Sequence, residues 1–309
     1  MVYHVKGVGN LFTDSHIGRI YKNGVPLNRL GDREKLVMDK FEEELSQTCS
    51  EKTIIHLGDI FNAPVVPLDV IKETYCLIYN MALRNSDHTY WFVAGNHDLS
   101  RNSERTDALE ILSILLAPFK NVKFVLKEPT MIHGNLVAVP YSYTKSNEEM
   151  LEKYFKSGNN PKIFVGHFEE PIDPYLSTKN IDIYSGHIHK QHRNGNVFFI
   201  GSSLPVVHGE ESNDDMFVTL SLDEVLCKKE TGELKNKCVR VVLKEGEVLP
   251  DDIDCLQLLA KKNEEEVVSD LSVDFESFDV EKLFRECLSD NPLTDSLWEK
   301  YLIMKTVEE

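Results

Sequence analysis

Residues 90–98 read YWFVAGNHD, an apolar run that ends in a cluster of polar side chains. Its first five residues are mostly aromatic or β-branched, which is typical of a buried strand. Asn96, His97 and Asp98 follow where that strand ends. In open α/β sheets, functional residues gather at the carboxyl ends of strands. The stretch therefore predicts an α/β sheet with a polar site at one edge.

The same combination recurs four more times along the chain. In each case a short apolar run is followed by a polar motif, and the four motifs are Asp14-Ser15-His16, Gly58-Asp59, Gly166-His167 and Gly186-His187-Ile188-His189. The glycine that precedes most of the polar residues lets the backbone turn tightly. A lone histidine is more often structural than catalytic, but packing alone does not explain five motifs with one placement.

The side chains of these motifs are of the kinds that bind divalent metal ions. A carboxylate can bridge two ions, while neutral imidazoles and an amide oxygen fill the remaining positions. The predicted ligands are Asp14, His16, Asp59, Asn96, His167, His187 and His189. This inventory predicts a two-metal phosphoesterase site, with His97 as a further histidine beside it.

Composition predicts one large domain with an appendage. The chain has 309 residues, of which 41% are hydrophobic, and no apolar run is long enough to span a membrane. We find no leader and expect a cytoplasmic protein, with no membrane partner. The six cysteines are scattered without a C-x-x-C pair, so we expect reduced thiols rather than a zinc site or disulfides.

The net charge of −17 is unusual for a nucleic-acid enzyme, because phosphate contacts need Lys and Arg. Much of the excess lies in residues 247–309, which hold 18 acidic and 6 basic side chains. We therefore expect contact with nucleic acid through local basic spots or a partner, rather than strong intrinsic DNA binding.

Helical periods alternate with the strands, which predicts α/β architecture for a first domain at residues 1–246. Helices are expected at 32–48, with Asp32 as the cap, and at 68–84, 105–118 and 146–156. Further strands are expected at 122–126, 131–133, 136–139, 197–200, 216–222 and 239–243, with Thr231-Gly232 as a turn between the last two.

Residues 247–309 are predicted to form a second, acidic segment. Pro250 and the acidic pair after it mark its start, and residues 252–262 are expected to be helical. A polar linker follows from Glu264 to Ser277, and two amphipathic helices follow it within residues 278–305. Such a helix pair can pack on its own domain or dock a partner.

The motifs resemble the calcineurin-like metallophosphoesterase superfamily. Within it, the chain is similar to the SbcD-type nuclease subunits of double-strand-break repair complexes, including bacteriophage recombination endonuclease subunits. The matching segments are Asp14 to Gly18 (D-x-H-[LV]-G), Gly58 to Phe61 (G-D-x-F), Gly95 to Asp98 (G-N-H-D), Gly186 to His189 (G-H-x-H) and Gly201 to Pro205. The resemblance covers roughly residues 8–222.

The resemblance implies two packed mixed β-sheets flanked by helices, with a small helical C-terminal appendage. One ion would take Asp14, His16, Asp59 and His189; the other would take Asp59, Asn96, His167 and His187. Manganese suits this ligand set, although iron or zinc would also fit. His97 would protonate the leaving oxygen, and Asp98 would either orient His97 or cap the next segment. Residues 278–305 would bind an ABC-type coiled-coil ATPase subunit, and a homodimer is possible.

The chain departs from the family in two respects. Asn62 stands where some relatives carry a histidine after G-D-x-F, and no convincing capping domain follows the first domain. For several other residues two interpretations stay open, contact with the substrate or an ordinary surface position. These residues are His192, His208, Arg101, Arg105, Lys190 and Arg193. His56, inside an apolar strand, is expected to be a packed core residue, while His4, His88 and His133 lie outside every motif.

Three functions compete. The first is a DNA exonuclease or endonuclease subunit acting in repair and recombination. The second is a phosphatase or cyclic-nucleotide phosphodiesterase of the same superfamily. The Ser/Thr phosphatases of this fold carry G-D-x-V-D-R-G, and Asn62 interrupts that motif, which favours a diester over a monoester. The third is a non-enzymatic scaffold, which would have no need for four imidazoles. No P-loop is present, so ATP-driven work would need another subunit.

Overall fold

The computed structural model describes residues 2–102, 104–156, 161–170, 180–208, 210, 216–250 and 252–262. The chain divides into two units, Met1–Asn263 and Glu264–Glu309. All described residues belong to the first unit. The predicted C-terminal helices lie outside the described residues.

The first unit contains two large mixed sheets. The five-stranded sheet has the order β1 (Tyr3–Val5), β2 (Gly9–Phe12), β3 (Thr53–His56), β4 (Thr89–Val93) and β5 (Val122–Val125). The six-stranded sheet has the order β10 (His192–Asn194), β11 (Val197–Phe199), β9 (Asp182–Ser185), β8 (Ile163–Gly166), β7 (Leu136–Val139) and β6 (Thr130–His133). Strands β2 to β5 are parallel, as are β7, β8, β9 and β11, whereas β1, β6 and β10 pair antiparallel at the edges.

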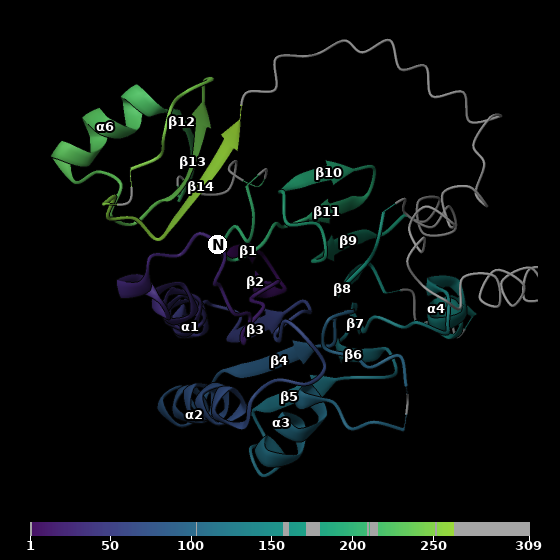
Figure 1. The fold of residues 1–309 in the computed structure, drawn as a ribbon. Coiled ribbons are helices and arrows are strands. Elements are labelled where there is room, and N and C mark those ends of the chain that lie inside the picture. Colours follow the sequence, from purple (N-terminus) through teal and green to yellow (C-terminus); the bar gives the residue numbers. More distant parts are fainter. Residues whose placement is uncertain are drawn as a thin grey trace, which may run out of the picture. The chain divides into compact units, whose positions relative to one another are not determined.

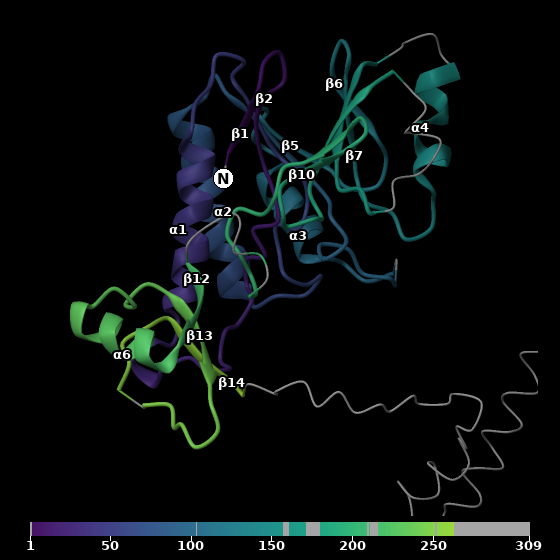
Figure 2. The same cartoon turned by 90° about the horizontal axis from the view of Figure 1, so that it is seen from above.

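A shared apolar core packs the two sheets face to face. Leu11 and Ile55 from the five-stranded sheet belong to the same buried cluster as Ala138 and Val165 from the six-stranded sheet. Helices α1 (Asp32–Ser46), α2 (Leu68–Arg84) and α3 (Ala108–Leu116) cover the other face of the first sheet, and α4 (Asn147–Lys156) covers the second (Figures 1 and 2). The predicted α/β fold of two packed mixed sheets flanked by helices is confirmed.

The prediction that Asp32 caps helix α1 was wrong. Asp32 is the first residue of the helix rather than its cap, because Gly31 takes the cap position in a left-handed conformation, with φ of 91°. The helix packs through Phe41 and Leu45, which are fully buried against the five-stranded sheet.

A three-stranded parallel sheet follows the two large ones, in the order β12 (Phe217–Ser221), β13 (Cys238–Leu243) and β14 (Gln257–Lys262). Helix α6 (Leu222–Thr231) connects β12 to β13. It starts with a capping box between Ser221 and Glu224 and ends at Gly232, which has a φ of 71°. The Thr231-Gly232 pair therefore ends a helix, and the prediction of a simple turn between strands was wrong.

The helix predicted at 252–262 was also wrong. Residues Gln257–Lys262 form strand β14, which pairs with β13 over all six residues. Pairing with a neighbouring strand overrides a local helical preference. As a result the first unit continues to Asn263, beyond the residue 246 at which the sequence suggested a division.

Buried arginines connect this small sheet to the N-terminal part of the first unit. Arg29 Nη1 donates to Asp254 Oδ1 at 2.6 Å, and Arg33 Nη1 donates to Gln257 Oε1 at 3.0 Å. The Arg33 guanidinium also lies 3.6 Å from the centre of the Tyr21 ring. No convincing capping domain was found in the sequence, whereas the structure has a three-stranded sheet between Phe217 and Lys262.

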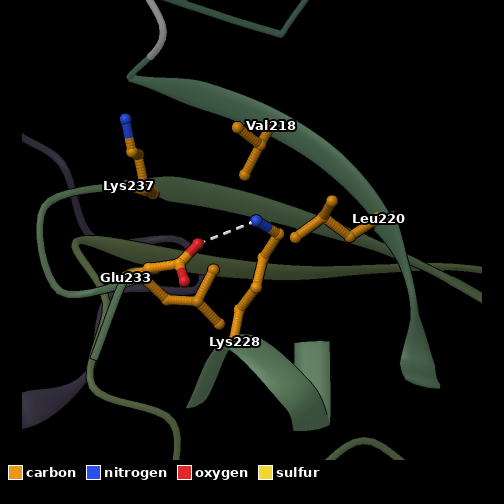
Figure 3. A pocket seen from close by; sticks show the side chains of 6 residues that line it. Val218, Leu220, Lys228, Glu233 and Lys237 are labelled. Atoms are coloured by element: carbon orange, nitrogen blue, oxygen red, sulfur yellow. Dashed lines mark hydrogen bonds and ion pairs between the residues drawn. The ribbon is translucent and has the colours of Figure 1, made fainter. Parts of the chain in front are cut away.

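A cavity of about 420 Å³ lies in the small sheet and is separate from the sequence motifs. It is lined by Val218, Leu220, Lys228, Glu233, Leu234 and Lys237 (Figure 3). Lys228 Nζ and Glu233 Oε2 form an ion pair of 2.9 Å across it. None of these residues belongs to the five motifs.

Helix hydrophobicity and the state of the cysteines concern the described ranges alone. None of the helices there has both the length and the apolar character needed to cross a bilayer. The five cysteines within those ranges, Cys49, Cys76, Cys227, Cys238 and Cys255, are free thiols, and Cys287 lies outside them.

Candidate metal centre

The structure brings all seven predicted ligands together. Each lies shortly after the end of a strand: Asp14 and His16 after β2, Asp59 after β3, Asn96 after β4, His167 after β8, and His187 and His189 after β9. Because the two sheets pack face to face, the carboxyl ends of their strands meet. One sheet supplies both carboxylates and the amide, and the other supplies three of the four imidazoles.

One group of side chains surrounds the carboxylate of Asp14. His189 Nε2 lies 3.7 Å from Asp14 Oδ1 and 3.1 Å from His16 Nε2. His16 Nε2 in turn lies 3.9 Å from Asp59 Oδ2. These four residues are the set predicted for one ion.

A second group lies on the other side of Asp59. His167 Nε2 is 3.3 Å from Asp59 Oδ2 and 2.9 Å from Asn96 Oδ1. His187 Nδ1 is 3.1 Å from Asn96 Oδ1 and 3.3 Å from His167 Nε2. The same oxygen, Asp59 Oδ2, therefore faces both groups, as it would in a carboxylate that bridges two ions through one oxygen.

The spacing of these atoms fits divalent metal ions. Nitrogen and oxygen ligands about 2.1 Å from one ion lie roughly 3.0–3.4 Å from each other. The distances in the second group, 2.9–3.3 Å, are close to this spacing, and those in the first group, 3.1–3.9 Å, are somewhat wider. His167 Nδ1 lies 3.0 Å from the carbonyl oxygen of Leu57, and His189 Nδ1 lies 2.9 Å from Glu210 Oε1. With each Nδ1–H donating in this way, Nε2 is the nitrogen that would bind a metal, with release of its proton where the ring is charged.

The buried carboxylates of the site also favour the binding of cations. Asp14, Asp59 and Asp98 are almost completely buried, and in the described part of the chain no Lys or Arg pairs with them. Burial alone would lower the pKa of His167, but the carboxylates of Asp59 and Asp14 raise it to about 9. Buried carboxylates are costly unless they are paired or coordinate metals, so divalent ions fit this position.

Backbone strain is concentrated at the same residues. Within the described ranges, the non-glycine residues with positive φ are Asp14 (54°), His16 (47°), Lys52 (53°), Asp59 (57°) and His187 (77°). All but Lys52 are predicted ligands. A left-handed conformation costs on the order of 1–3 kcal/mol for such residues and persists where the surroundings fix it. The ligands are therefore held by the fold, at a cost in stability.

The carboxylate of Asp98 holds the loop after β3. It accepts hydrogen bonds from the backbone N–H groups of Asp59 (2.8 Å), Ile60 (3.3 Å), Phe61 (2.9 Å) and Gly95 (2.9 Å). Burial and the nearby charge of Asp59 raise the pKa of Asp98 to about 7, although the N–H groups act in the opposite direction. Both predicted roles, orienting His97 and capping a helix, are replaced by this one.

Two glycines are required by close approach to the ligands. A Cβ at Gly95 would overlap the side chain of Asp59, and a Cβ at Gly58 would overlap the imidazole of His167. Gly58 also has a φ of 116°, which side chains rarely allow. The predicted tight turn is found at Gly58, whereas Gly95 is needed for space.

His56 is a buried core residue, as predicted, and it also supports the first motif. It is completely buried, and burial lowers its pKa to about 3, so the ring is neutral. Gly58 N–H donates to His56 Nδ1 at 3.3 Å, which leaves the proton on Nε2 to be donated to Ser15 Oγ at 2.9 Å. His56 thus links the motifs after β2 and β3.

His97 lies beside the metal ligands and is exposed. Its ring nitrogen Nδ1 is 2.8 Å from the carbonyl oxygen of Asn62, and its backbone N–H donates to Asp59 Oδ1 at 2.8 Å. The His97 and His16 rings are 4.8 Å apart. The ring is therefore oriented by the backbone of Asn62, at the position where some relatives carry a histidine.

Two features of the site were not predicted. Glu210 orients His189, and its other oxygen accepts the backbone N–H of Val206 at 2.7 Å. Tyr141 and Tyr143 follow β7, which is one more strand that ends in polar residues. That pattern could have revealed the tyrosines, whereas nothing local marks Glu210.

The remaining candidates lie apart from the ligand groups. His192 stacks on Phe199 at 4.7 Å and lies 3.0 Å from Glu170, while His208 packs against Phe217. Contact of His192, His208, Arg105, Lys190 or Arg193 with a substrate stays a prediction.

Comparisons with known proteins agree with this geometry. Residues 11–191 match the family model described as calcineurin-like phosphoesterase. The DNA double-strand break repair protein Mre11 of Methanococcus maripaludis is 24% identical over 171 residues, which span 53% of this chain and 43% of that protein. A crystal structure of the Pseudomonas putida nuclease MPE aligns with 64% of this chain and 78% of that one, at 13% identity and a TM-score of 0.27. A TM-score of that size does not establish a shared fold.

The role of Asp98 yields the first prediction. Asp98→Asn replaces one of the two acceptor oxygens with an NH₂ group that faces backbone donors, so we expect the Asp59 loop to shift. Divalent metal affinity, measured by isothermal titration calorimetry, should fall at both positions, and stability should fall by about 2–4 kcal/mol. Asp107→Asn is the matched control, because Asp107 Oδ1 accepts the backbone N–H of Ser100 outside the site. Wild-type metal affinity in Asp98→Asn would contradict this role.

Proposed function

The chain belongs to the calcineurin-like phosphoesterase family, and we propose that it is a two-metal phosphodiesterase that serves as the DNA nuclease subunit of an SbcCD-like repair and recombination complex. Asp59 Oδ2 is the observation that carries the proposal, since it faces a group of metal-binding side chains on either side. The family uses a dinuclear metal site, and this arrangement offers candidate ligands for one. Manganese suits the mixture of imidazoles and carboxylates.

The residues of the chain have distinct roles in such a reaction. Asp14, His16 and His189 would hold one ion, Asn96, His167 and His187 the other, and Asp59 both. Two divalent ions supply Lewis-acid chemistry, which lowers the pKa of water and balances the charge of a reacting phosphate. His97 donates its Nδ1–H to the carbonyl of Asn62, which leaves Nε2 to carry a proton to the leaving oxygen.

The site favours a phosphodiester over a monoester. A monoester dianion carries one more charge than a diester, and the phosphatases of this fold meet that charge with an arginine. Here Asn62 interrupts the motif that carries it, and within the described ranges no Lys or Arg pairs with the ligand carboxylates.

DNA as the substrate is supported by the sequence resemblance and by the likeness to a protein named for double-strand break repair. The net charge of −17 makes a partner important for DNA binding. An ABC-type ATPase bound by residues 278–305, and a homodimer, remain proposals, because these C-terminal residues lie outside the described part of the chain.

A substrate comparison tests this function. We expect the manganese-loaded protein to hydrolyse an aryl phosphodiester faster than the matching monoester, because Asn62 interrupts the motif in which the phosphatases carry their arginine for the dianion. It should also cleave linear DNA, assayed on duplex, single strands and closed circles. A strong preference for the monoester would contradict the nuclease function and indicate a phosphatase.

The position of His97 gives a further prediction. His97→Ala should lower the turnover of the diester by roughly 10²–10⁴-fold, because the leaving oxygen loses its proton donor. Metal content, measured by elemental analysis of the same samples, should stay unchanged. His133→Ala removes an exposed histidine on β6 and serves as the control. A parallel loss of metal from His97→Ala would instead make His97 a ligand.

A further inference from the structure

We propose that Tyr141, Tyr143 and Arg101 form a subsite for an unpaired nucleobase and its neighbouring phosphate, next to the metal centre. These three residues are called the tyrosine platform below. The inference rests on the proposed function, because it names the form of nucleic acid that the same site accepts. It predicts that the reacting strand is single-stranded or frayed where it meets the centre.

The platform lies directly beside the second group of ligands. The Tyr143 hydroxyl donates to the carbonyl oxygen of Asn96 at 2.7 Å, and the side chain of Asn96 faces His167 and His187. The Tyr141 ring is 6.4 Å from the ring of His167. A nucleotide whose phosphate reacts at the centre would therefore reach the platform with an adjacent base.

Both rings are held in place before any substrate arrives. The backbone N–H of Tyr141 donates to Ala94 at 2.9 Å, and its hydroxyl donates to Glu169 at 2.7 Å. Burial and the Glu169 carboxylate raise the pKa of Tyr141, so the hydroxyl remains a donor. The two tyrosine rings contact each other edge to face, with centroids 5.0 Å apart. Aromatic groups fixed in this way lose little conformational entropy on binding.

The platform is open to solvent and carries a positive charge. Tyr143 is 41% exposed, and the guanidinium of Arg101 lies 5.4 Å from the centre of its ring. No carboxylate within the described ranges forms an ion pair with Arg101, which leaves its charge for a phosphate. Glu169 would repel a phosphate near Tyr141, so the base is expected on the rings and the phosphate on the Arg101 side.

These features match the way proteins bind single strands. Aromatic rings stack on the faces of bases without regard to sequence, and arginine adds contacts to base and backbone. In a duplex both faces of each base are already stacked, so this mode requires an unpaired base. Loss of one stacking ring weakens binding by roughly 5- to 100-fold.

The experiment compares two substitutions of Tyr143 in the full-length protein. Tyr143→Phe and Tyr143→Leu both lose the hydroxyl bond to Asn96, but only Phe keeps the ring. The substrates are a single-stranded oligonucleotide and the same oligonucleotide with abasic positions around the cleaved bond. Binding is measured by fluorescence anisotropy with Ca²⁺, and kcat and KM are measured with Mn²⁺.

The platform predicts a preference for the intact over the abasic strand in wild type and in Tyr143→Phe. Tyr143→Leu should lose that preference through a roughly 5- to 100-fold rise in Kd and KM for the intact strand. Arg101→Ala should weaken binding of both strands, while Arg84→Ala, which removes an exposed arginine in the last turn of α2, should not.

Equal affinity of the wild-type protein for intact and abasic strands would overturn the inference, and so would an unchanged preference in Tyr143→Leu. If Tyr143→Leu does not fold, the comparison of Arg101→Ala with Arg84→Ala in the same binding assay decides the question. A wild-type protein that binds both strands but cleaves neither would contradict the proposed nuclease function. In that case the binding comparison still tests the platform.

Discussion

The centre depends on the hydrogen bonds that the buried carboxylate of Asp98 accepts from the backbone. This carboxylate gathers four backbone N–H groups from the loops after β3 and β4, three of them from consecutive residues starting at Asp59. Those bonds hold Asp59 at a φ of 57°, with Oδ2 facing both groups of metal-binding side chains. The resulting concentration of buried negative charge is stable only with imidazolium or metal cations beside it.

The packing of the two sheets then decides whether a centre forms at all. Asp14, Asp59 and Asn96 come from the five-stranded sheet, while the paired imidazoles of His167 and His187 come from the six-stranded sheet. The apolar core between the sheets sets the distance between these halves. The left-handed backbone conformation at four of the candidate ligands is strained, and the packing of the two sheets maintains it. As a result the ligand atoms are already arranged without a bound metal.

Much of the fold, and the meeting of the seven candidate ligands at one place, could be predicted because their signals are local. A short apolar run followed by a polar motif identifies both a strand and its functional end, as at Tyr90 to Asp98. Strand β14 was missed because its conformation is set by pairing with β13, not by its own sequence. The role of Asp98 was missed because its partners include backbone groups 37–39 residues away, and Glu210 lies 21 residues from the histidine that it orients.

We propose that one carboxylate, Asp59, would bridge two metal ions bound to this chain. Electron paramagnetic resonance of the protein titrated with Mn²⁺ tests that claim most directly, because ions about 3.5–4 Å apart and sharing a ligand are magnetically coupled. We predict a coupled two-ion spectrum at two equivalents of Mn²⁺, which Asp59→Asn should abolish. A spectrum of isolated ions at full loading, or a coupled spectrum retained in Asp59→Asn, would contradict the account.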